Sequence, residues 1–233
     1  GGGVVNLSDA SNNYIYRSGL GSLVNMDNTI RGAGRMGWTS LPTDIENHGL
    51  IVADLTTPLT IESGANATFT NMGTARAENG GVLRFNSATV DNTGGVIEAL
   101  DGSTVTLESS GISGGTLSTA GTGAIESANS LSYLDNLSNT GRVRVPNTRR
   151  LYLSGTINNT GTITLDSTGA STYIYANIAE VTLTGGGVIA MSDSQNNWIY
   201  RQGEGSLTNV DNTFRGSGHL GWTSLPTDFV NQG

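Results

Sequence analysis

The segment LSNTGRVRVPNTRRLYLSGTINNTGTITL, residues Leu137–Leu165, contains one short pattern twice. In each copy an apolar residue and a spacer precede Asn139 or Asn159, and Thr-Gly and a short alternating strand follow. Alternation with a period of two predicts a strand with one buried and one solvated face. Gly accepts positive φ and the Asn side chain bonds nearby backbone groups, so Asn and Gly are expected at the corners between strands.

The same pattern recurs along the whole chain. Its third residue is Asn or Gly, and successive third residues lie 20 to 26 positions apart. This return to one corner predicts an all-β fold, a parallel β-solenoid (β-helix) of about ten turns without substantial helix, rather than an antiparallel sandwich. With turns about 4.8 Å apart, the corner asparagines are expected to form a hydrogen-bonded ladder. The predicted ladder residues are Asn25, Asn47, Asn71, Asn92, Asn139, Asn159, Asn209 and Asn231.

A longer repeat lies over the short one. Shifting the sequence by 184 residues aligns Gly1–Gly49 with Gly185–Gly233 without a gap, and 32 of the 49 pairs are identical. We therefore interpret 1–233 as a single continuous solenoid, with 1–184 as one complete repeat unit and 185–233 as the start of the next. We expect the array to continue beyond this sequence. About eight turns per unit, each about 4.8 Å high, give a rise of roughly 40 Å per repeat.

The composition limits the function classes. The formal net charge is −8, all 11 basic residues are Arg, and there is no Cys. The acidic balance opposes nucleic-acid binding, and the lack of Cys excludes disulfides and Cys-ligated metals. No run of about 18 apolar residues is present, so no membrane-spanning segment is expected. A Cys-free, Lys-free chain rich in Gly, Asn and Thr is typical of secreted proteins of the bacterial surface, and we expect an extracellular or cell-surface location.

The turns, written hxNxGxIxh with h apolar, resemble those of filamentous-haemagglutinin-type adhesins and autotransporter passenger domains. The resemblance covers nearly the whole chain and implies a right-handed parallel β-helix with a structural or adhesive role. The 184-residue repeat is more similar to very large bacterial surface proteins built from tandem β-solenoid blocks.

The sequence offers little for catalysis. Only two His are present, and no common hydrolase, phosphate-binding or metal motif occurs. The pairs Asp27/Arg31 and Asp211/Arg215 come nearest to the Asp and Arg groups of polysaccharide-processing β-helices. Each pair has one carboxylate and one guanidinium, so we interpret them as structural salt bridges or corner contacts. We predict no catalytic residue, no cofactor and no metal site.

Aromatic and basic residues form the candidate contact surface. Three strands carry aromatic pairs around a central Ile that is expected to point inward, which leaves the rings outside, unless a covering loop buries them. A run of arginines is expected either to dock on an acidic surface or to be solvated charges that resist aggregation. The candidate contact residues are Tyr14, Tyr16, Trp38, Arg142, Arg144, Arg149, Arg150, Tyr173, Tyr175, Trp198, Tyr200 and Trp222.

The octapeptide GWTSLPTD occurs at Gly37–Asp44 and again at Gly221–Asp228. Pro42 and Pro226 cannot donate to a sheet ladder, so each copy is predicted to be a corner or a short outward loop. The Trp of each copy is expected either to cap the local core or to form an exposed knob, and the knob is favoured.

These observations favour a structural and adhesive segment of a giant secreted or cell-surface fibre, built from tandem repeats and associating with itself in filaments. Its expected partners are neighbouring repeats and chains, with a carbohydrate or a cell-surface receptor as a further possibility. Two alternatives stay open. One is a carbohydrate- or ice-binding module, although Thr ladders such as TVTL and TITL do not occur in every turn. The other is a polysaccharide-processing enzyme.

Overall fold

The computed structural model describes residues 1–129, 131–203, 205–225 and 228–233, with every side chain except those of 178 and 179. The described residues form strands and turns without a helix, and successive strands pair in parallel through about ten turns of about 22 residues. The predicted all-β, parallel β-solenoid is therefore confirmed. Contacts divide the chain into two compact units, Gly1–Ile125 and Glu126–Gly233, and each is described by itself. The single continuous solenoid stays a prediction.

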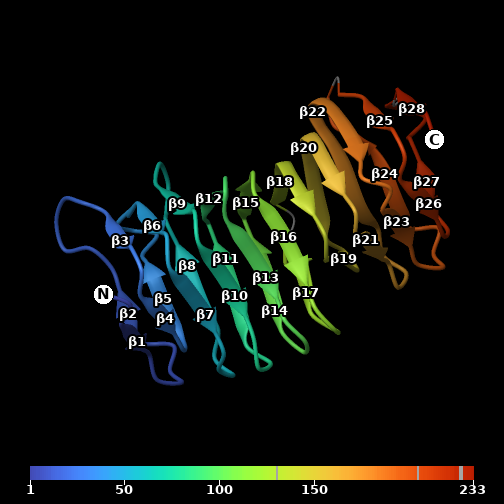
Figure 1. Cartoon of the computed structure of the whole chain (residues 1–233). Coiled ribbons are helices and arrows are strands. Elements are labelled where there is room, and N and C mark those ends of the chain that lie inside the picture. The colour runs from blue at the N-terminus through green and yellow to red at the C-terminus, as the bar shows by residue number, and fades with distance from the viewer. Residues whose placement is uncertain (130, 204, 226–227) are drawn as a thin grey trace. The chain divides into compact units, whose positions relative to one another are not determined.

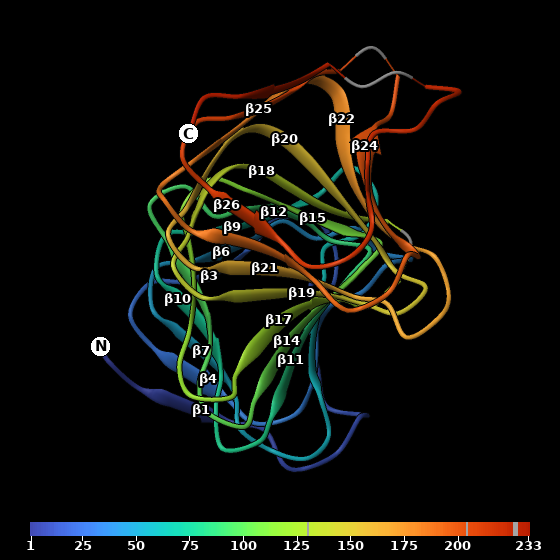
Figure 2. The same cartoon turned by 90° about the vertical axis from the view of Figure 1, so that its right-hand side faces the viewer.

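The strands of the first unit form three parallel rows, which lie on three sides of its interior (Figures 1 and 2). The first row contains β1 (Val4–Asn6), β4 (Thr29–Arg31), β7 (Leu50–Ala53), β10 (Thr74–Ala77), β13 (Val96–Ala99) and β16 (Thr116–Thr119). The second row contains β2 (Tyr14–Ile15), β5 (Gly34–Gly37), β8 (Leu59–Glu62), β11 (Val82–Asn86) and β14 (Thr104–Glu108). The third row contains β3 (Leu23–Asn25), β6 (Ile45–Asn47), β9 (Thr68–Asn71), β12 (Thr89–Asp91) and β15 (Ser110–Ser113). The boundary between the units falls within β17 (Ala124–Ser127).

Alternate residues of these strands fill the interior of the first unit. Each row contributes a column of apolar side chains, because parallel pairing without slippage places equivalent residues of successive turns above one another. Ile51, Leu83 and Phe69 have no exposed surface. The rings of Phe69 and Phe85 face each other across the interior, with centroids 5.7 Å apart. The period-two alternation thus builds one narrow and mainly apolar core.

The second unit also has three rows, and long strands join two of them. Its first row contains β19 (Arg142–Pro146), β21 (Thr162–Asp166), β23 (Val188–Met191) and β26 (Thr213–Arg215). The strands β18 (Ser132–Asn139), β20 (Arg150–Asn159) and β22 (Thr172–Thr184) each span the second and third rows. The second row continues with β24 (Asn197–Arg201) and β27 (His219–Leu220), and the third with β25 (Leu207–Asn209) and β28 (Phe229–Asn231). The register shifts between Asp135 and Leu137 and between Leu153 and Gly155, where the long strands turn the corner.

The asparagine ladder of the first unit is confirmed. The side-chain amide of each Asn donates to the side-chain oxygen of the Asn one turn later, at 2.8 Å from Asn25 to Asn47, 2.8 Å from Asn47 to Asn71 and 2.7 Å from Asn71 to Asn92. All four side chains are buried. The ladder ends where Gly114 replaces Asn, and the amide of Asn92 bonds backbone carbonyls instead.

The ladder of the second unit follows an unexpected route. Asn139 donates to Asn159 at 2.7 Å, as predicted, and Asn209 donates to Asn231 at 2.7 Å. The short pattern has Gly185 as its third residue in this turn and so predicts that Gly185 lies beside Asn209. This register is wrong by two residues, because Asn209 pairs with Leu183. Asn159 instead donates at 2.8 Å to the side-chain oxygen of Asn212, which lies 53 residues further along the chain. Asn212 thus bridges the place where Gly185 has no side chain.

Packing requires some of the glycines that follow a ladder Asn by two residues, and Gly73 is an example. The φ of Gly73 is not positive, so backbone freedom is not its reason. A Cβ at Gly73 would overlap the carbonyl oxygen of Gly49 in the turn below. The turns approach so closely at Gly73 that only Gly fits there, so the expectation that positive φ explains these glycines is wrong for Gly73, whereas Gly94 has a φ of 80°.

Candidate functional site

The second unit carries aromatic side chains in two columns on the outer face of its second row. Parallel pairing places Tyr133 beside Tyr152, Tyr152 beside Tyr175, and Tyr175 beside Tyr200. A second column, two residues earlier in each strand, contains Arg150, Tyr173, Trp198 and His219. Because equivalent positions of successive turns lie one strand spacing apart, residues of one column meet face to face.

The rings of these columns are in direct contact. Tyr133, Tyr152 and Tyr175 stack with centroids 4.8 Å apart, and Tyr200 meets Tyr175 edge-on at 4.9 Å. In the other column Trp198 stacks on His219 at 3.9 Å. Stacked and edge-on pairs add about 0.5–1.5 kcal/mol each beyond the burial of their area. The face is therefore a rigid aromatic surface, and its geometry is set by the sheet.

A hollow of about 200 Å³ opens on this face. It is lined by Ser171, Tyr173, Trp198, Tyr200 and Trp222. Polar groups at the hollow are the hydroxyl of Ser171 and the indole N–H of Trp198, whose nitrogen is buried and has no hydrogen-bond partner. The surface thus combines broad apolar ring faces with a few polar groups, as small-molecule and peptide sites do.

The first unit has a matching hollow at the equivalent positions of the long repeat. It has a volume of about 290 Å³ and is lined by Tyr14, Tyr16 and Trp38. These residues correspond to Trp198, Tyr200 and Trp222 across the 184-residue shift. In both copies the octapeptide Trp meets its Tyr edge-on, at 5.6 Å from Tyr16 to Trp38 and 5.5 Å from Tyr200 to Trp222. The aromatic hollow is therefore a property of the repeat.

The exposure of the aromatic residues differs from one position to the next. Tyr14, Tyr16, Trp38 and Trp222 are 43–50% exposed. Tyr173 and Trp198 are partly buried. The exposure expected for Tyr175 and Tyr200 is wrong, because they are only 7% and 8% exposed. Stacking between turns covers both tyrosines, and Leu225 packs against the same cluster.

The central isoleucines behave as predicted in the second unit. Ile174 and Ile199 point into the coil and are 2% exposed. Ile15, the equivalent of Ile199 in the first unit, is only partly buried. Two further rings of the surface, Tyr133 and Tyr152, were absent from the sequence prediction. Their separation by 19 residues, close to one turn, was the signal that could have found them.

The octapeptide forms a tight outward turn, as predicted. In the first copy Trp38 pairs with Leu41 in an isolated antiparallel bridge, and the amide of Leu41 donates to the carbonyl of Trp38 at 2.9 Å. The second copy has the same bridge between Trp222 and Leu225. Pro42 directly follows the first turn, whereas Pro226 lies outside the described residues. This turn holds the Trp ring beside the preceding strand.

The four clustered arginines do not form one free basic patch. Arg144 forms ion pairs with Glu126 and Asp166, and these two carboxylates neutralise its charge. The hydrogen bond that Arg144 donates to the carboxylate of Asp166 raises the pKa of Arg144 above its usual value. The guanidinium of Arg150 lies 5.4 Å from the ring centre of Tyr173, within cation–π range. Arg142 and Arg149 are partly exposed.

One residue of the tyrosine column, Tyr175, has a raised pKa. Tyr200 donates a hydrogen bond to the hydroxyl of Tyr175 at 3.2 Å. Burial, reinforced by this hydrogen bond, raises the pKa of Tyr175 far above that of a free tyrosine. Tyr175 is therefore a neutral structural element of the stack at any physiological pH.

In the first unit, ion pairs join side chains of neighbouring turns. Arg35 bonds Glu62 at 2.9 Å, and Arg84 lies 3.2 Å from Glu108. The expected pairing of Asp27 with Arg31 is wrong: Arg31 pairs with Asp54 one turn later. Parallel pairing sets Arg31 beside Val52 of the next turn, and this brings the carboxylate of Asp54 to its guanidinium.

The comparisons add no relative. No protein-family model, curated protein or solved structure matches this chain. Among the described residues, no group of three or more His, Cys, Asp or Glu side chains is placed to hold a metal ion. Within the same residues, no helix has the length and apolar character needed to cross a membrane. The aromatic surface is therefore the candidate site that the geometry singles out.

Proposed function

We propose that this chain is a structural and adhesive segment of a secreted or cell-surface fibre made of tandem 184-residue β-solenoid repeats. In this proposal the solenoid is a stiff spacer without a catalytic role, and the aromatic hollows make lateral contacts between neighbouring chains. The observation that supports it most directly is the recurrence of one exposed aromatic hollow at equivalent positions, Tyr14/Tyr16/Trp38 and Trp198/Tyr200/Trp222.

The chemistry of the hollow supports a protein contact. Exposed aromatic clusters are rare on isolated soluble proteins and mark interaction sites. Trp38 and Trp222 are 44% and 46% exposed and are held by a tight turn, so little conformational entropy is lost when they are buried in an interface. Contacts repeated along a fibre at a fixed rise would also multiply a weak affinity.

The proposal is tested by the self-association of the full chain. We expect concentrated wild-type protein to associate laterally, and a Trp38→Ala/Trp222→Ala variant to remain monomeric with an unchanged circular dichroism spectrum. An exposed residue away from the hollow, in a Met72→Ala variant, is the matched control. Equal sedimentation of the wild-type and double-variant proteins at all concentrations would mean that the aromatic hollows make no lateral contact, and this part of the proposal would be wrong.

A second candidate, carbohydrate binding, is favoured by one specific observation. The 200 Å³ hollow offers the ring faces of Tyr173, Trp198 and Trp222 together with the Ser171 hydroxyl, and sugars present apolar C–H faces with polar edges. Titration with a panel of neutral hexasaccharides, followed by tryptophan fluorescence, tests it. Saturable binding by wild type that Trp222→Ala abolishes would support it, and no response to any sugar would eliminate it for this panel.

A further inference from the structure

Two methionines and a histidine share one column on the outside of the first unit. The ladder asparagines of the third row pair in parallel, and the residues directly after the first three of them are Met26, His48 and Met72. The amide of His48 donates to the carbonyl of Asn25 at 2.8 Å, and the amide of Met72 donates to that of Asn47 at 2.8 Å. The parallel register therefore continues through these positions, and neighbours in the column lie about 4.8 Å apart.

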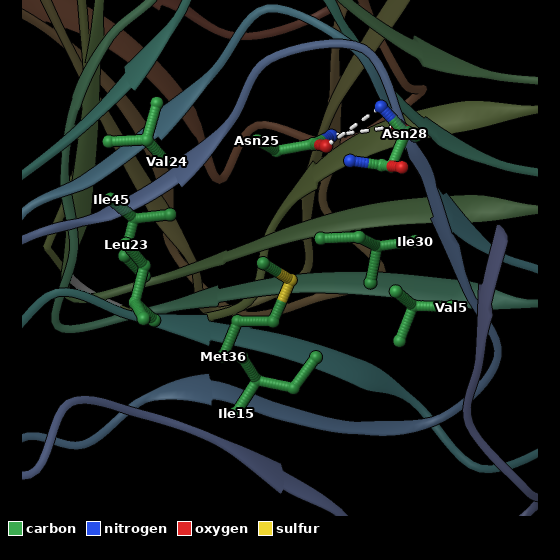
Figure 3. A pocket seen from close by; sticks show the side chains of 9 residues that line it. All are labelled: Val5, Ile15, Leu23, Val24, Asn25, Asn28, Ile30, Met36 and Ile45. Carbon is green, nitrogen blue, oxygen red and sulfur yellow. Dashed lines mark hydrogen bonds between the residues drawn. The ribbon is translucent and has the colours of Figure 1, made fainter. Parts of the chain in front are cut away.

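The side chains of this column point away from the core. Figure 3 shows the buried side chain of Asn25 bonded to the backbone of Asn28. Because successive residues of a strand face opposite sides, the residue after each ladder Asn faces outward. Met26 is 61% exposed and Met72 is 43% exposed, and the His48 side chain between them is 31% exposed. Both thioethers are therefore free to turn toward the imidazole, since Met has three rotatable side-chain bonds.

A carboxylate orients the histidine of the column. Nε2 of His48 lies 2.6 Å from Oε1 of Glu46. A carboxylate only accepts hydrogen bonds, so Nε2 donates and, in the neutral imidazole, Nδ1 keeps its lone pair. Within the described residues, Nδ1 has no hydrogen-bond partner. Histidines that bind metals have this arrangement, in which one ring nitrogen donates to a carboxylate and the other binds the metal.

The column offers ligands that suit a soft metal ion. Thioether sulfur selects Cu(I), whereas Mg²⁺ and Ca²⁺ take oxygen ligands. Two sulfurs and one imidazole nitrogen are all neutral, and Glu46 adds one negative charge to balance one positive charge. The net charge of −8 also attracts cations. The chain has only four Met and two His, and three of these six residues lie in this one column.

The long repeat shows that the corner does not need these side chains for its fold. Val210 and Gln232 of the second copy stand at the positions of Met26 and His48. The amide of Gln232 donates to the carbonyl of Asn209 at 2.9 Å, as the amide of His48 does to its own ladder Asn. The same corner thus forms with and without the soft side chains, so packing does not explain their presence in the first unit.

We propose that Met26, His48 and Met72 form a binding site for Cu(I), with one ion held by the two thioether sulfurs and Nδ1 of the imidazole. Glu46 orients the imidazole and balances the charge of the ion. The three ligands lie 22 and 24 residues apart in sequence, which is why the sequence alone predicts no metal site. The site is separate from the aromatic hollows and goes beyond the proposed function.

The experiment follows the four methionine methyl groups of the full chain by NMR. Protein with isotope-labelled methionine methyl groups is titrated with silver nitrate in chloride-free buffer, because Ag(I) is a soft monovalent ion that is stable in air. We expect the signals of Met26 and Met72 to shift together and to saturate at one equivalent. Those of Met36, which is buried, and Met191, which is partly exposed, should stay in place. Anaerobic competition with a chromophoric Cu(I) chelator then measures the affinity for Cu(I), and Mg²⁺ should move none of the signals.

Four variants and one control assign the ligands. His48→Gln and Met26→Val match the residues of the second copy, so the corner should still fold, and circular dichroism checks this. We expect each of them, and Met72→Leu, to weaken binding by at least about tenfold, since the loss of even an outer partner of a metal-binding His has an effect of this size. Glu46→Gln, which removes such an outer partner, should weaken binding by about tenfold. Met191→Leu removes a methionine outside the column and should leave the affinity unchanged.

Each outcome decides the proposal. Saturation of the Met26 and Met72 signals at one equivalent, with loss of this response in His48→Gln and with Cu(I) taken from the chelator, establishes the site. A shift of Met191 at the same Ag(I) concentrations, or equal affinity of His48→Gln and wild type, would show adventitious binding to single thioethers and overturn the proposal. Ag(I) binding without any uptake of Cu(I) would also overturn it. None of these results bears on lateral association, which the Trp38→Ala/Trp222→Ala variant tests separately.

Discussion

Replacing Asn47 with Ala tests how much the buried ladder stabilises the coil. The Asn47 side chain has no exposed surface, donates to Asn71 at 2.8 Å and accepts from Asn25 at 2.8 Å. Each such bond contributes about 1 kcal/mol net, and a stranded buried partner costs a further 1–3 kcal/mol. Asn25 keeps a second acceptor, the Asn28 carbonyl at 2.9 Å, so the stranded group is the side-chain oxygen of Asn71. We expect a loss of about 3–5 kcal/mol, including the small cavity.

The loss should be local, because each turn of a solenoid contacts only its neighbours. Native-state hydrogen exchange therefore detects this local loss of stability better than thermal unfolding of the whole chain does. The amides of Met72 and Gly73 both donate to the Asn47 carbonyl, at 2.8 and 2.9 Å, and report opening at this corner. Asn6→Ala, an exposed change, should alter their protection by less than about 0.5 kcal/mol. If Asn47→Ala and Asn6→Ala have the same small effect at these amides, the ladder does not hold the turns together.

Three further predictions concern single side chains. Because burial raises the pKa of Tyr175, this side chain should stay protonated at pH 11 in the folded protein. An unfolded tyrosine ionises near pH 10, so the stability should fall as the pH rises above about 10. Ultraviolet titration of wild type and Tyr175→Phe checks both expectations, and full ionisation by pH 11 in folded protein contradicts them. Hydrogen bonds from Thr122 lower the pKa of Asp101. They therefore stabilise the folded state above about pH 4, and this contribution is lost as the pH falls through the pKa of Asp101 in the folded protein. Carboxyl NMR should show a higher Asp101 pKa in Thr122→Val, and an unchanged value refutes the assignment. Tyr152→Ala should lower the free energy of unfolding by about 3–5 kcal/mol, because it empties the middle of the ring stack. Tyr152→Phe should keep most of the stability, as measured by urea unfolding. Equal losses in the two variants would mean that the hydroxyl, and not the stack, matters.

The fold was predictable because the short pattern recurs once per turn, so that its Asn returns to the same corner each time. Asn47 and Asn71 each follow an apolar residue and precede a Gly at nearly constant spacing, so sequence alone places them above one another. The physical reason for the Gly was not predictable, because it lies in the approach of another turn. The route through Asn212 also escaped prediction: it depends on a two-residue register shift at Leu183 and on a side chain that reaches past a neighbouring turn.

The candidate site was predictable in part of its residues but not in their exposure. Alternation around Ile174 and Ile199 correctly predicts that these two isoleucines point into the coil. It cannot show that Tyr175 and Tyr200 cover each other, because that depends on which turns pair and in what register. Likewise, the charge of Arg144 looked free because its partners, Glu126 and Asp166, lie 18 and 22 residues away in sequence.

Electron microscopy of the native material can show whether the repeats form one fibre. We expect continuous filaments whose axial repeat is near 40 Å, or a multiple of it, as about eight turns of about 4.8 Å require. The aromatic knob formed by Trp38 should recur at that spacing on the filament surface. Discrete particles without an axial repeat would contradict the account.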